Sequence, residues 1–230
     1  MGWEDAKTHQ RLPLKQTDIK IISLDFDGTL IESNQIKDNA FKTLFGEWPE
    51  HRDAMMRWHF DHNSIERQEK FRYFVEKVLR LKGRDDLIRE LTTKFGKITI
   101  QAVIDCPFVE GAQHFLEYIN SRVKTYLVSA TPQEELNIII KERKLDVYFK
   151  KVYGAPINKI DILKQIMESE NATVDEMLFI GDSPEDQDAA ESLGIHFIGR
   201  QSDRPLNKSK NNIVLDFFKI KNHLIQYYRI

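Results

Sequence analysis

The stretch IKIISLDFDGTL, residues 19–30, decides how the whole chain is interpreted. Its first half is apolar and β-branched over the length of a strand, which is typical of a strand covered on both faces of a parallel sheet. The run ends in Asp25 and Asp27, and the alternation of an extended chain places both side chains on one side. Gly28 then allows a sharp turn. The stretch predicts a buried strand that carries two carboxylates at its carboxyl end.

Five further runs downstream have the same short, apolar character, and segments with apolar residues at helical spacing lie between them. Leu136, Ile139 and Ile140 share one such helical face. The strand-like runs are 123–129, 150–154, 176–182, 195–199 and 212–217. Strand–helix alternation of this kind predicts an α/β fold, an open parallel sheet with helices on both sides.

The alternation of strand-like and helical segments is interrupted between Asp25 and Val123, where about a hundred residues show almost no strand pattern. Apolar side chains there recur at helical spacing, for example Phe71, Phe74 and Val75. We therefore predict a helical lobe inserted after the first strand. The predicted division is a polar lead-in at 1–18, a core at 19–33 and 105–230, and the helical lobe at 34–104.

Composition excludes several classes of protein. The 230 residues include 34 Lys and Arg against 36 Asp and Glu, a formal charge of −2, which argues against a polybasic nucleic-acid binder. The single cysteine, Cys106, cannot form an internal disulfide or a cysteine-rich metal site. No apolar run reaches the roughly 18 residues of a membrane span, and the first 18 residues contain no secretion signal. We expect a cytoplasmic protein without nucleic-acid or membrane partners.

Polar residues at three other strand ends fit the same edge of the predicted sheet. Ser129 closes the run 123–129, Lys159 opens the helix after 150–154, and GDSPED (181–186) closes the run 176–182. In an open parallel sheet, ligands bind beyond the carboxyl ends of the strands. We therefore expect these residues to meet Asp25 and Asp27 in one site.

The acids of this site need a cation. Two unit charges about 4 Å apart repel by roughly 4 kcal/mol at an effective dielectric near 20. Asp25, Asp27, Asp182 and Asp186 could therefore not converge cheaply alone. Oxygen-only ligands and a phosphate-bearing substrate favour Mg²⁺. Lys159 and the Ser129 hydroxyl would then hold phosphate oxygens.

These motifs, in this order, resemble those of the haloacid dehalogenase superfamily phosphatases. The likeness covers about residues 19–217: DFDGTL at 25–30, Ser129, Lys159, and the GDxxxD pattern at 181–186. The first and last motifs are highly specific as a pair. The resemblance implies a Rossmann-like core with a helical cap inserted after the first motif, where the sequence shows its helical stretch.

The resemblance also implies a mechanism and a division of roles. Asp25 would attack phosphorus and form an aspartyl-phosphate, while Asp27 would serve as general acid and then general base. Mg²⁺ would be held by Asp25, the Asp27 backbone carbonyl and Asp182, with Asp186 as a further ligand or an anchor. The transferring group would be bound by Ser129, Lys159 and backbone amides near Gly28. The expected activity is Mg²⁺-dependent hydrolysis of a small phosphorylated metabolite.

Other functions stay open. A phosphomutase would also need both aspartates, but mutases of this family typically carry His twelve residues after the nucleophile, where this chain has Lys37. A dehalogenase is disfavoured because Asp27 is present. Phosphoglycolate phosphatases usually follow the third-motif Lys with Pro, whereas Ile160 follows here. A catalytically silent binding protein on the same scaffold is the alternative from another class.

The helical lobe is the least readable part of the chain. Arg67 and Lys70 are near an expected helix start and could contact an anionic substrate, although a solvated basic face explains them equally well. Ser64 is the expected N-cap of that helix. His59 and His62 are interpreted as surface histidines rather than zinc ligands, since no Cys joins them. Monomer and homodimer are both compatible with the sequence.

Overall fold

A computed structural model describes residues 16–62, 65–204, 206 and 212–230. Within these ranges the chain is built on a six-stranded sheet in the order β4-β3-β2-β5-β6-β7, with every neighbouring pair parallel. The strands are β2 (Ile21–Leu24), β3 (Lys124–Pro132), β4 (Lys151–Ala155), β5 (Met177–Gly181), β6 (His196–Arg200) and β7 (Asn212–Val214). Each strand overlaps one of the six apolar runs, and β3, β4 and β6 extend one to three residues beyond theirs. The predicted α/β parallel sheet is confirmed.

The strand order positions the site. The chain moves from β2 to β3 on one side and later returns to β5 on the other side, so the order reverses at β2. Leu24 pairs with Leu127 of β3 and with Ile180 of β5. The residues that follow these three positions therefore emerge at the same edge, which is where ligands bind in sheets of this type.

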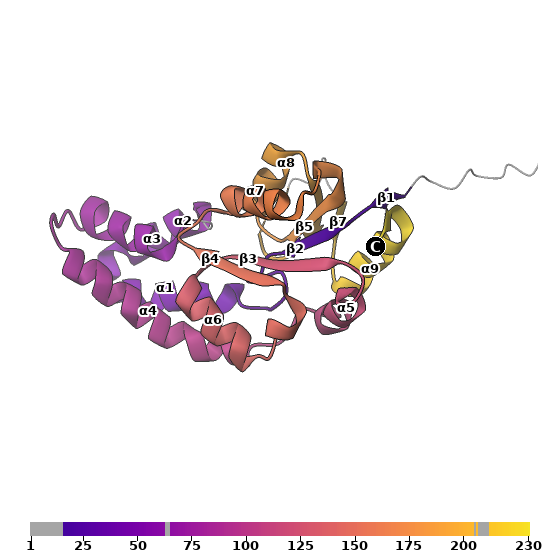
Figure 1. Cartoon of the computed structure of the whole chain (residues 1–230). Helices are drawn as coiled ribbons and strands as arrows, with labels where there is room; N and C mark the ends of the chain where they lie inside the picture. Colours follow the sequence, from indigo (N-terminus) through magenta and orange to yellow (C-terminus); the bar gives the residue numbers. More distant parts are fainter. Residues whose placement is uncertain (1–15, 63–64, 205, 207–211) are drawn as a thin grey trace, which may run out of the picture.

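Helices cover both faces of the sheet (Figure 1). On one face, α5 (Ala112–Ile119), α6 (Gln133–Glu142) and α9 (Phe217–Tyr227) pack against Ile22 and Leu24. On the other, α7 (Lys159–Glu170) and α8 (Pro184–Leu193) pack against Ile21 and Phe179. The strand residues are buried from both sides, which explains why their sequence is continuously apolar rather than alternating.

The stretch between β2 and α5 is helical, as predicted, and extends beyond the sheet at its carboxyl edge (Figure 1). It comprises α1 (Asn34–Phe45), α2 (Pro49–Asp61), α3 (Arg67–Tyr73), a π-helical turn (Phe74–Val78) and α4 (Asp85–Asp105). These helices share a core of their own, in which the rings of Phe41 and Phe95 lie 4.5 Å apart. The C-terminal part of α4 reaches the main core, where Val103 is buried beneath the sheet. We call this stretch the helical segment.

The end of the chain differs from the sequence interpretation. The run 212–217 was expected to be a strand throughout, but β7 ends at Val214 and α9 begins at Phe217. The Asp216 side chain accepts a hydrogen bond from the backbone N–H of Lys219 at 2.8 Å. A side chain that caps a helix in this way ends the extended backbone, which is why the strand prediction was too long.

Two other expectations concern residues that are partly or wholly outside the described ranges. Most of the lead-in lies outside them, but Thr17–Asp18 forms β1, which pairs in parallel with β8 (Tyr228–Arg229). The expected N-cap Ser64 lies outside the described residues, and α3 begins at Arg67. Among the described helices, none is both long and apolar enough to cross a membrane.

Candidate active site

The turn after β2 places Asp25 at the centre of the sheet edge. The Asp25 N–H donates to the Ile180 carbonyl of β5 at 2.9 Å, which continues the sheet by one residue. Gly28 has φ = 75°, in the left-handed region that glycine adopts without strain. A Cβ at this position would lie 2.3 Å from Asp182 Oδ2, so the backbone of the turn passes against the second acidic motif.

Asp25, Asp182 and Asp186 come together at this edge. Each offers a carboxylate oxygen, and the three oxygens lie within 4.8 Å of one another. Lys159, at the start of α7, donates to Asp25 Oδ1 at 2.7 Å and to Asp186 Oδ1 at 2.5 Å. The Thr29 hydroxyl lies 3.1 Å from both Asp25 Oδ2 and Asp182 Oδ1. Three chain segments that are far apart in sequence therefore share one charged site.

The electrostatics of this group call for a cation. Burial raises the pKa of Asp25 well above its ordinary value, and the neighbouring carboxylates of Asp186 and Asp182 raise it further against the opposing charge of Lys159. Burial and Asp186 together raise the pKa of Asp182 to about 6. Buried carboxylates with raised pKa values are stabilised as anions by a divalent ion. The donors are hard oxygen atoms, so the residues fit Mg²⁺.

Asp186 is held in place by its own helix start. The Ser183 N–H donates to Asp186 Oδ2 at 3.1 Å and the Asp186 N–H donates to Ser183 Oγ at 3.3 Å, which forms a capping box at the start of α8. The Ser183 hydroxyl also donates to Asp186 Oδ2, at 2.6 Å. The other oxygen of Asp186 accepts from Lys159. Both oxygens thus have protein partners, and the contact through Oδ1 makes Asp186 an anchor for Lys159.

Asp27 belongs to a separate network beside the acidic group. Its Oδ1 accepts from the Ser33 hydroxyl at 2.6 Å, and its Oδ2 accepts from the Thr131 hydroxyl at 2.8 Å and forms an ion pair with Lys37. Burial alone would raise the pKa of Asp27, but Lys37 and these hydrogen bonds outweigh it and hold the pKa below its ordinary value. The side chain of Asp27 is therefore positioned apart from the three acids that surround Lys159.

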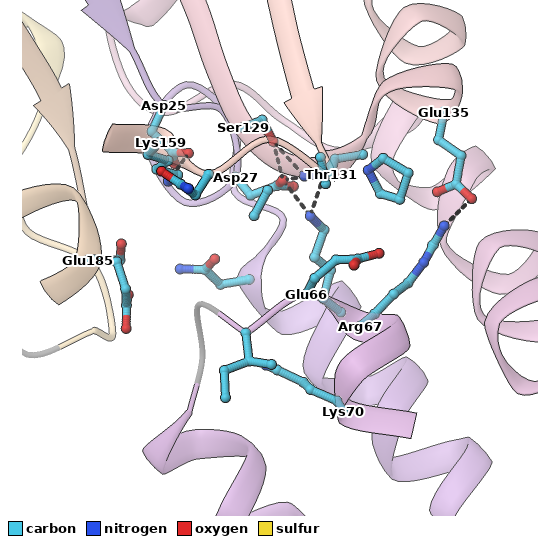
Figure 2. Close-up of a pocket in the computed structure, with 18 of the residues that line it drawn as sticks. Asp25, Asp27, Glu66, Arg67, Lys70, Ser129, Thr131, Glu135, Lys159 and Glu185 are labelled. Carbon is cyan, nitrogen blue, oxygen red and sulfur yellow. Dashed lines mark hydrogen bonds and ion pairs between the residues drawn. The ribbon is translucent and has the colours of Figure 1, made fainter. Parts of the chain in front are cut away.

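Ser129 lies next to this network (Figure 2). Its hydroxyl accepts from the Thr131 N–H at 3.0 Å and lies 3.4 Å from Asp27 Oδ2. β3 continues past Ser129 to Pro132, with an irregularity in its pairing to β4 between Val128 and Pro132. Sequence reasoning missed Thr131, whose only signal was its place two residues after the motif serine.

Three other supporting residues were not recognised as such from the sequence. The amide of Asn34 donates to Asp182 Oδ2 at 3.1 Å and to Asp203 Oδ1 at 2.9 Å. Arg200 donates to the Gly28 carbonyl at 2.9 Å. Lys37, noted in the sequence only because a mutase would have His there, contacts Asp27 directly. No local pattern distinguishes such residues from ordinary surface residues.

The site opens into a cavity of about 520 Å³ that is walled by the sheet edge and the helical segment. Asp25, Asp27, Ser129, Lys159 and Asp182 line one end of it. Arg67 and Lys70, the residues proposed to contact substrate, line the part formed by the helical segment. These seven residues, all proposed from the sequence as site residues, therefore line one cavity.

The two basic residues of the helical segment have protein partners. Arg67 forms an ion pair with Glu135 of α6, on the other wall of the cavity (Figure 2). Lys70 is 2% exposed, and its Nζ lies 3.0 Å from His59 Nδ1. The reading of these residues as a solvated basic face is thus wrong, because both side chains are turned into the protein.

The prediction of a surface position for His59 is also wrong. His59 is 3% exposed; its Nε2 lies 2.8 Å from Asp38 Oδ1 and its ring packs 4.4 Å from the Phe41 ring. A histidine with a polar partner at each nitrogen can be buried without an unpaired group. His62 is half-buried and stacks on Trp58.

Comparison with protein families gives an independent assignment. The family model described as haloacid dehalogenase-like hydrolase matches residues 22–200 of this chain, which include all four motifs. No curated protein sequence matches the chain.

Solved structures with the same fold include enzymes of this kind. A predicted phosphoglycolate phosphatase from Haemophilus somnus superposes with a TM-score of 0.71 at 18% identity, covering 89% of this chain and 97% of the other. A haloacid dehalogenase-like family protein from Streptococcus pneumoniae gives 0.69 at 18% identity, covering 90% and 98%. CbbY from Rhodobacter sphaeroides, solved in complex with xylulose-(1,5)-bisphosphate, gives 0.68 at 12% identity, covering 86% and 95%. At these identities the likeness shows the shared fold.

The family match and the assembled motifs agree. The matched residues contain the acid-bearing turn after β2, the Lys159 contact and the Asp182–Asp186 segment that meet at one sheet edge. The chain therefore belongs to the haloacid dehalogenase-like hydrolase family.

Proposed function

We propose that this protein is a Mg²⁺-dependent phosphatase that hydrolyses a small phosphorylated metabolite through an aspartyl-phosphate on Asp25. One observation carries the proposal: the Asp25 carboxylate is buried between Lys159 and the acids Asp182 and Asp186, and it faces the same cavity as Asp27. A nucleophile and a second carboxylate on a separate network are the two groups that a double-displacement hydrolysis requires.

Asp25 and Lys159 would act together on the phosphoryl group. An oxygen of Asp25 attacks phosphorus, and the bond to the leaving-group oxygen breaks. Burial by itself would lower the pKa of Lys159, but Asp186 and Asp25 raise it above its ordinary value, so the ammonium stays charged. A fixed cation beside the nucleophile stabilises the negative charge of the transferring group.

Asp25, Asp182 and the backbone carbonyl of Asp27 would hold the metal. When bound, Mg²⁺ neutralises part of the charge on the phosphoryl oxygens. Lys159 and Asp186 then keep the metal-binding carboxylate of Asp25 oriented through the contacts described above. Asn34 does the same for Asp182.

Asp27 would move the protons. The first step requires the protonated form of Asp27, which donates to the leaving-group oxygen, and the second requires the carboxylate, which accepts a proton from the attacking water. Because its pKa is held below the ordinary value, the carboxylate is the major form of Asp27 in the free protein, and the protonated form needed for the first step is the minor one. Ser33, Thr131 and Lys37 fix its carboxylate at the cavity wall, which supplies the orientation that proton transfer requires.

The test is phosphate release from a panel of phosphorylated metabolites with Mg²⁺ present. We expect wild type to turn over, chelation of the metal to abolish turnover, and Asp25→Asn to fall to background. Asp27→Asn should lose roughly 10²–10⁴-fold, the usual contribution of general acid–base catalysis. Asp175→Asn, an exposed change in the 3-10 turn (Val174–Glu176) that precedes β5, is the matched control.

Full activity in Asp25→Asn would disprove the nucleophile assignment. Absence of both phosphate release and Mg²⁺ binding at millimolar concentration would instead favour a catalytically silent binding protein.

A phosphomutase is the second candidate, because it uses the same two aspartates. Lys37 at the position of the mutase histidine, and its ion pair with Asp27, favour hydrolysis over that reading. Isomerisation of a sugar phosphate without net phosphate release would instead identify the protein as a phosphomutase. Cytoplasmic residence and the absence of nucleic-acid or membrane partners stay predictions of the sequence.

A further inference from the structure

The part of the cavity remote from Asp25 determines which leaving groups fit. It is formed by the helical segment on one side and by the core residues that face it on the other. Its charged side chains fall into two sets that differ in whether they already have partners. The bases have protein partners, whereas the carboxylates of Glu66 and Glu185 accept no hydrogen bond from the described residues.

Each base in this region is engaged. The Arg67 guanidinium is ion-paired with Glu135, and a glycine at position 96 leaves room for that pair, because a Cβ there would lie 2.8 Å from Glu135 Oε1. Arg204 donates to Asp38 Oδ1 at 2.9 Å. Lys70 contacts His59, and the carboxylate of Glu185 lies close enough to act on its charge. An anion would have to break these contacts to reach a cation.

Glu185 and Glu66 are in the opposite situation. Glu185 Oε2 is buried and has no hydrogen-bond partner in the described structure. The Glu66 carboxylate forms no hydrogen bond or ion pair with another described residue, and burial raises its pKa against the opposing charge of the neighbouring Arg67. A buried acceptor without a donor is unfavourable until a ligand supplies one.

The two carboxylates belong to different walls of the same space (Figure 2). Glu66 immediately precedes α3 of the helical segment, and Glu185 is in the first turn of α8 in the core. A leaving group in the cavity would lie between them. Both would present acceptors to it, whereas the neighbouring bases face their own partners.

We infer that the substrate is a phosphomonoester whose leaving group donates hydrogen bonds and carries no negative charge, such as a polyol or an amino alcohol, with Glu66 and Glu185 as the residues that select it. This inference rests on the proposed phosphatase function. It also revises the sequence expectation that Arg67 and Lys70 would contact an anion. A carboxylate or second phosphate on the leaving group would be placed against two carboxylates that accept no hydrogen bond from the described residues, and like charges at an interface reject the wrong partner.

The experiment compares matched pairs of substrates that differ in one group. Glycerol 1-phosphate and 3-phosphoglycerate differ in a hydroxymethyl against a carboxylate, and 2-aminoethyl phosphate and phosphoglycolate differ in an aminomethyl against a carboxylate. Acetyl phosphate, which is too small to span the cavity, reports on the phosphoryl end alone. We expect wild type to favour the non-anionic member of each pair by about tenfold or more in kcat/KM. The size of the preference in each pair shows whether hydroxyl or ammonium is the better donor.

Variants then assign the selectivity to residues. Glu66→Gln and Glu185→Gln remove the charge and add an amide donor, so each should reduce the preference several-fold, roughly three to ten, mainly by lowering KM for the anionic member. Glu69→Gln, an exposed change on the same helix as Arg67, should leave the preference unchanged. Circular dichroism and thermal unfolding confirm that each variant is folded.

The outcomes separate the two proposals. If acetyl phosphate is hydrolysed but wild type favours the anionic member of both pairs, the phosphatase function stands and the inference is wrong. Unchanged preference in both glutamine variants would also overturn it. If acetyl phosphate and every other ester are inert, the proposed function fails. Calorimetric binding of glycerol 1-phosphate and 3-phosphoglycerate to Asp25→Asn then tests the selectivity without turnover, and tighter binding of 3-phosphoglycerate would refute it.

Discussion

At the scale of single residues, the site depends on how closely backbone and side chains approach one another. Gly28 is the clearest case, because it combines a left-handed backbone with contact to the second acidic motif. Gly83 has a similar φ of 68°, but a Cβ there would meet nothing within 4 Å. Substitution of Gly83 therefore tests the strain of a left-handed backbone alone, whereas substitution of Gly28 tests that strain together with the steric clash against Asp182 and Asn34.

We predict that Gly28→Ala abolishes phosphate release, because the added methyl displaces Asp182 or Asn34. Gly83→Ala should retain activity and lower the free energy of unfolding by about 1–2 kcal/mol, the strain of an L-residue in the left-handed region. Urea unfolding and phosphate release measure the two effects. Equal activity in both variants would show that the turn tolerates a side chain and that the contact is unimportant.

At the scale of elements, α6 secures the return of the helical segment to the core. Arg143, just after α6, donates through one Nη1 to the carbonyls of Val103, Ile104 and Cys106 at 3.0, 2.6 and 2.8 Å. These carbonyls belong to the C-terminal end of α4, where no further intrahelical partner is available and where a cation is favoured.

Arg143→Met should therefore lower the free energy of unfolding by about 1–3 kcal/mol, because part-buried carbonyls lose their donor. Arg122→Met is the matched control: Arg122 also donates to a carbonyl near a helix end, that of Tyr118, but at an exposed position. Thermal and urea unfolding of both variants provide the comparison. A loss in Arg143→Met no larger than that in the control would mean that α4 is secured by packing alone.

At the scale of the whole molecule, a chain of buried polar contacts links the helical segment to the core. Lys70 of α3 contacts His59 of α2, His59 contacts Asp38 of α1, and Asp38 accepts from Arg204, which follows β6. Burial, with a contribution from Arg204, lowers the pKa of Lys70 to about 7 against the opposing charges of Asp38 and Glu185.

This shift predicts a pH dependence of stability. Below about pH 7, Lys70 is protonated in both the folded and the unfolded state, and folding must bury a charge. As the pH rises above about 7, the folded state releases the proton while the unfolded state keeps it until about pH 10.4, so stability increases. The free energy of unfolding of wild type, relative to Lys70→Met, should rise between about pH 6 and pH 9. A flat or falling difference in urea unfolding would contradict a lowered pKa.

The sequence alone determined the architecture and the motif residues. The six apolar runs located the six strands, because burial of a parallel sheet on both faces leaves a continuous apolar pattern in the local sequence. The helical spacing between β2 and α5 was an equally local pattern. Asp25, Lys159 and Asp182 could be placed together because parallel strands end at one edge.

Only the tertiary structure decided which partners these and other charges have. The contact of His59 with Asp38, the pairing of Arg67 with Glu135, and the ion pair of Lys37 with Asp27 join residues that are 10 to 68 positions apart. The identity of a residue in the sequence does not show whether its side chain faces water, a protein partner or an open cavity. Its role depends on the packing of distant segments, which local periodicity does not encode, and for that reason the substrate-selecting wall became visible only in the folded chain.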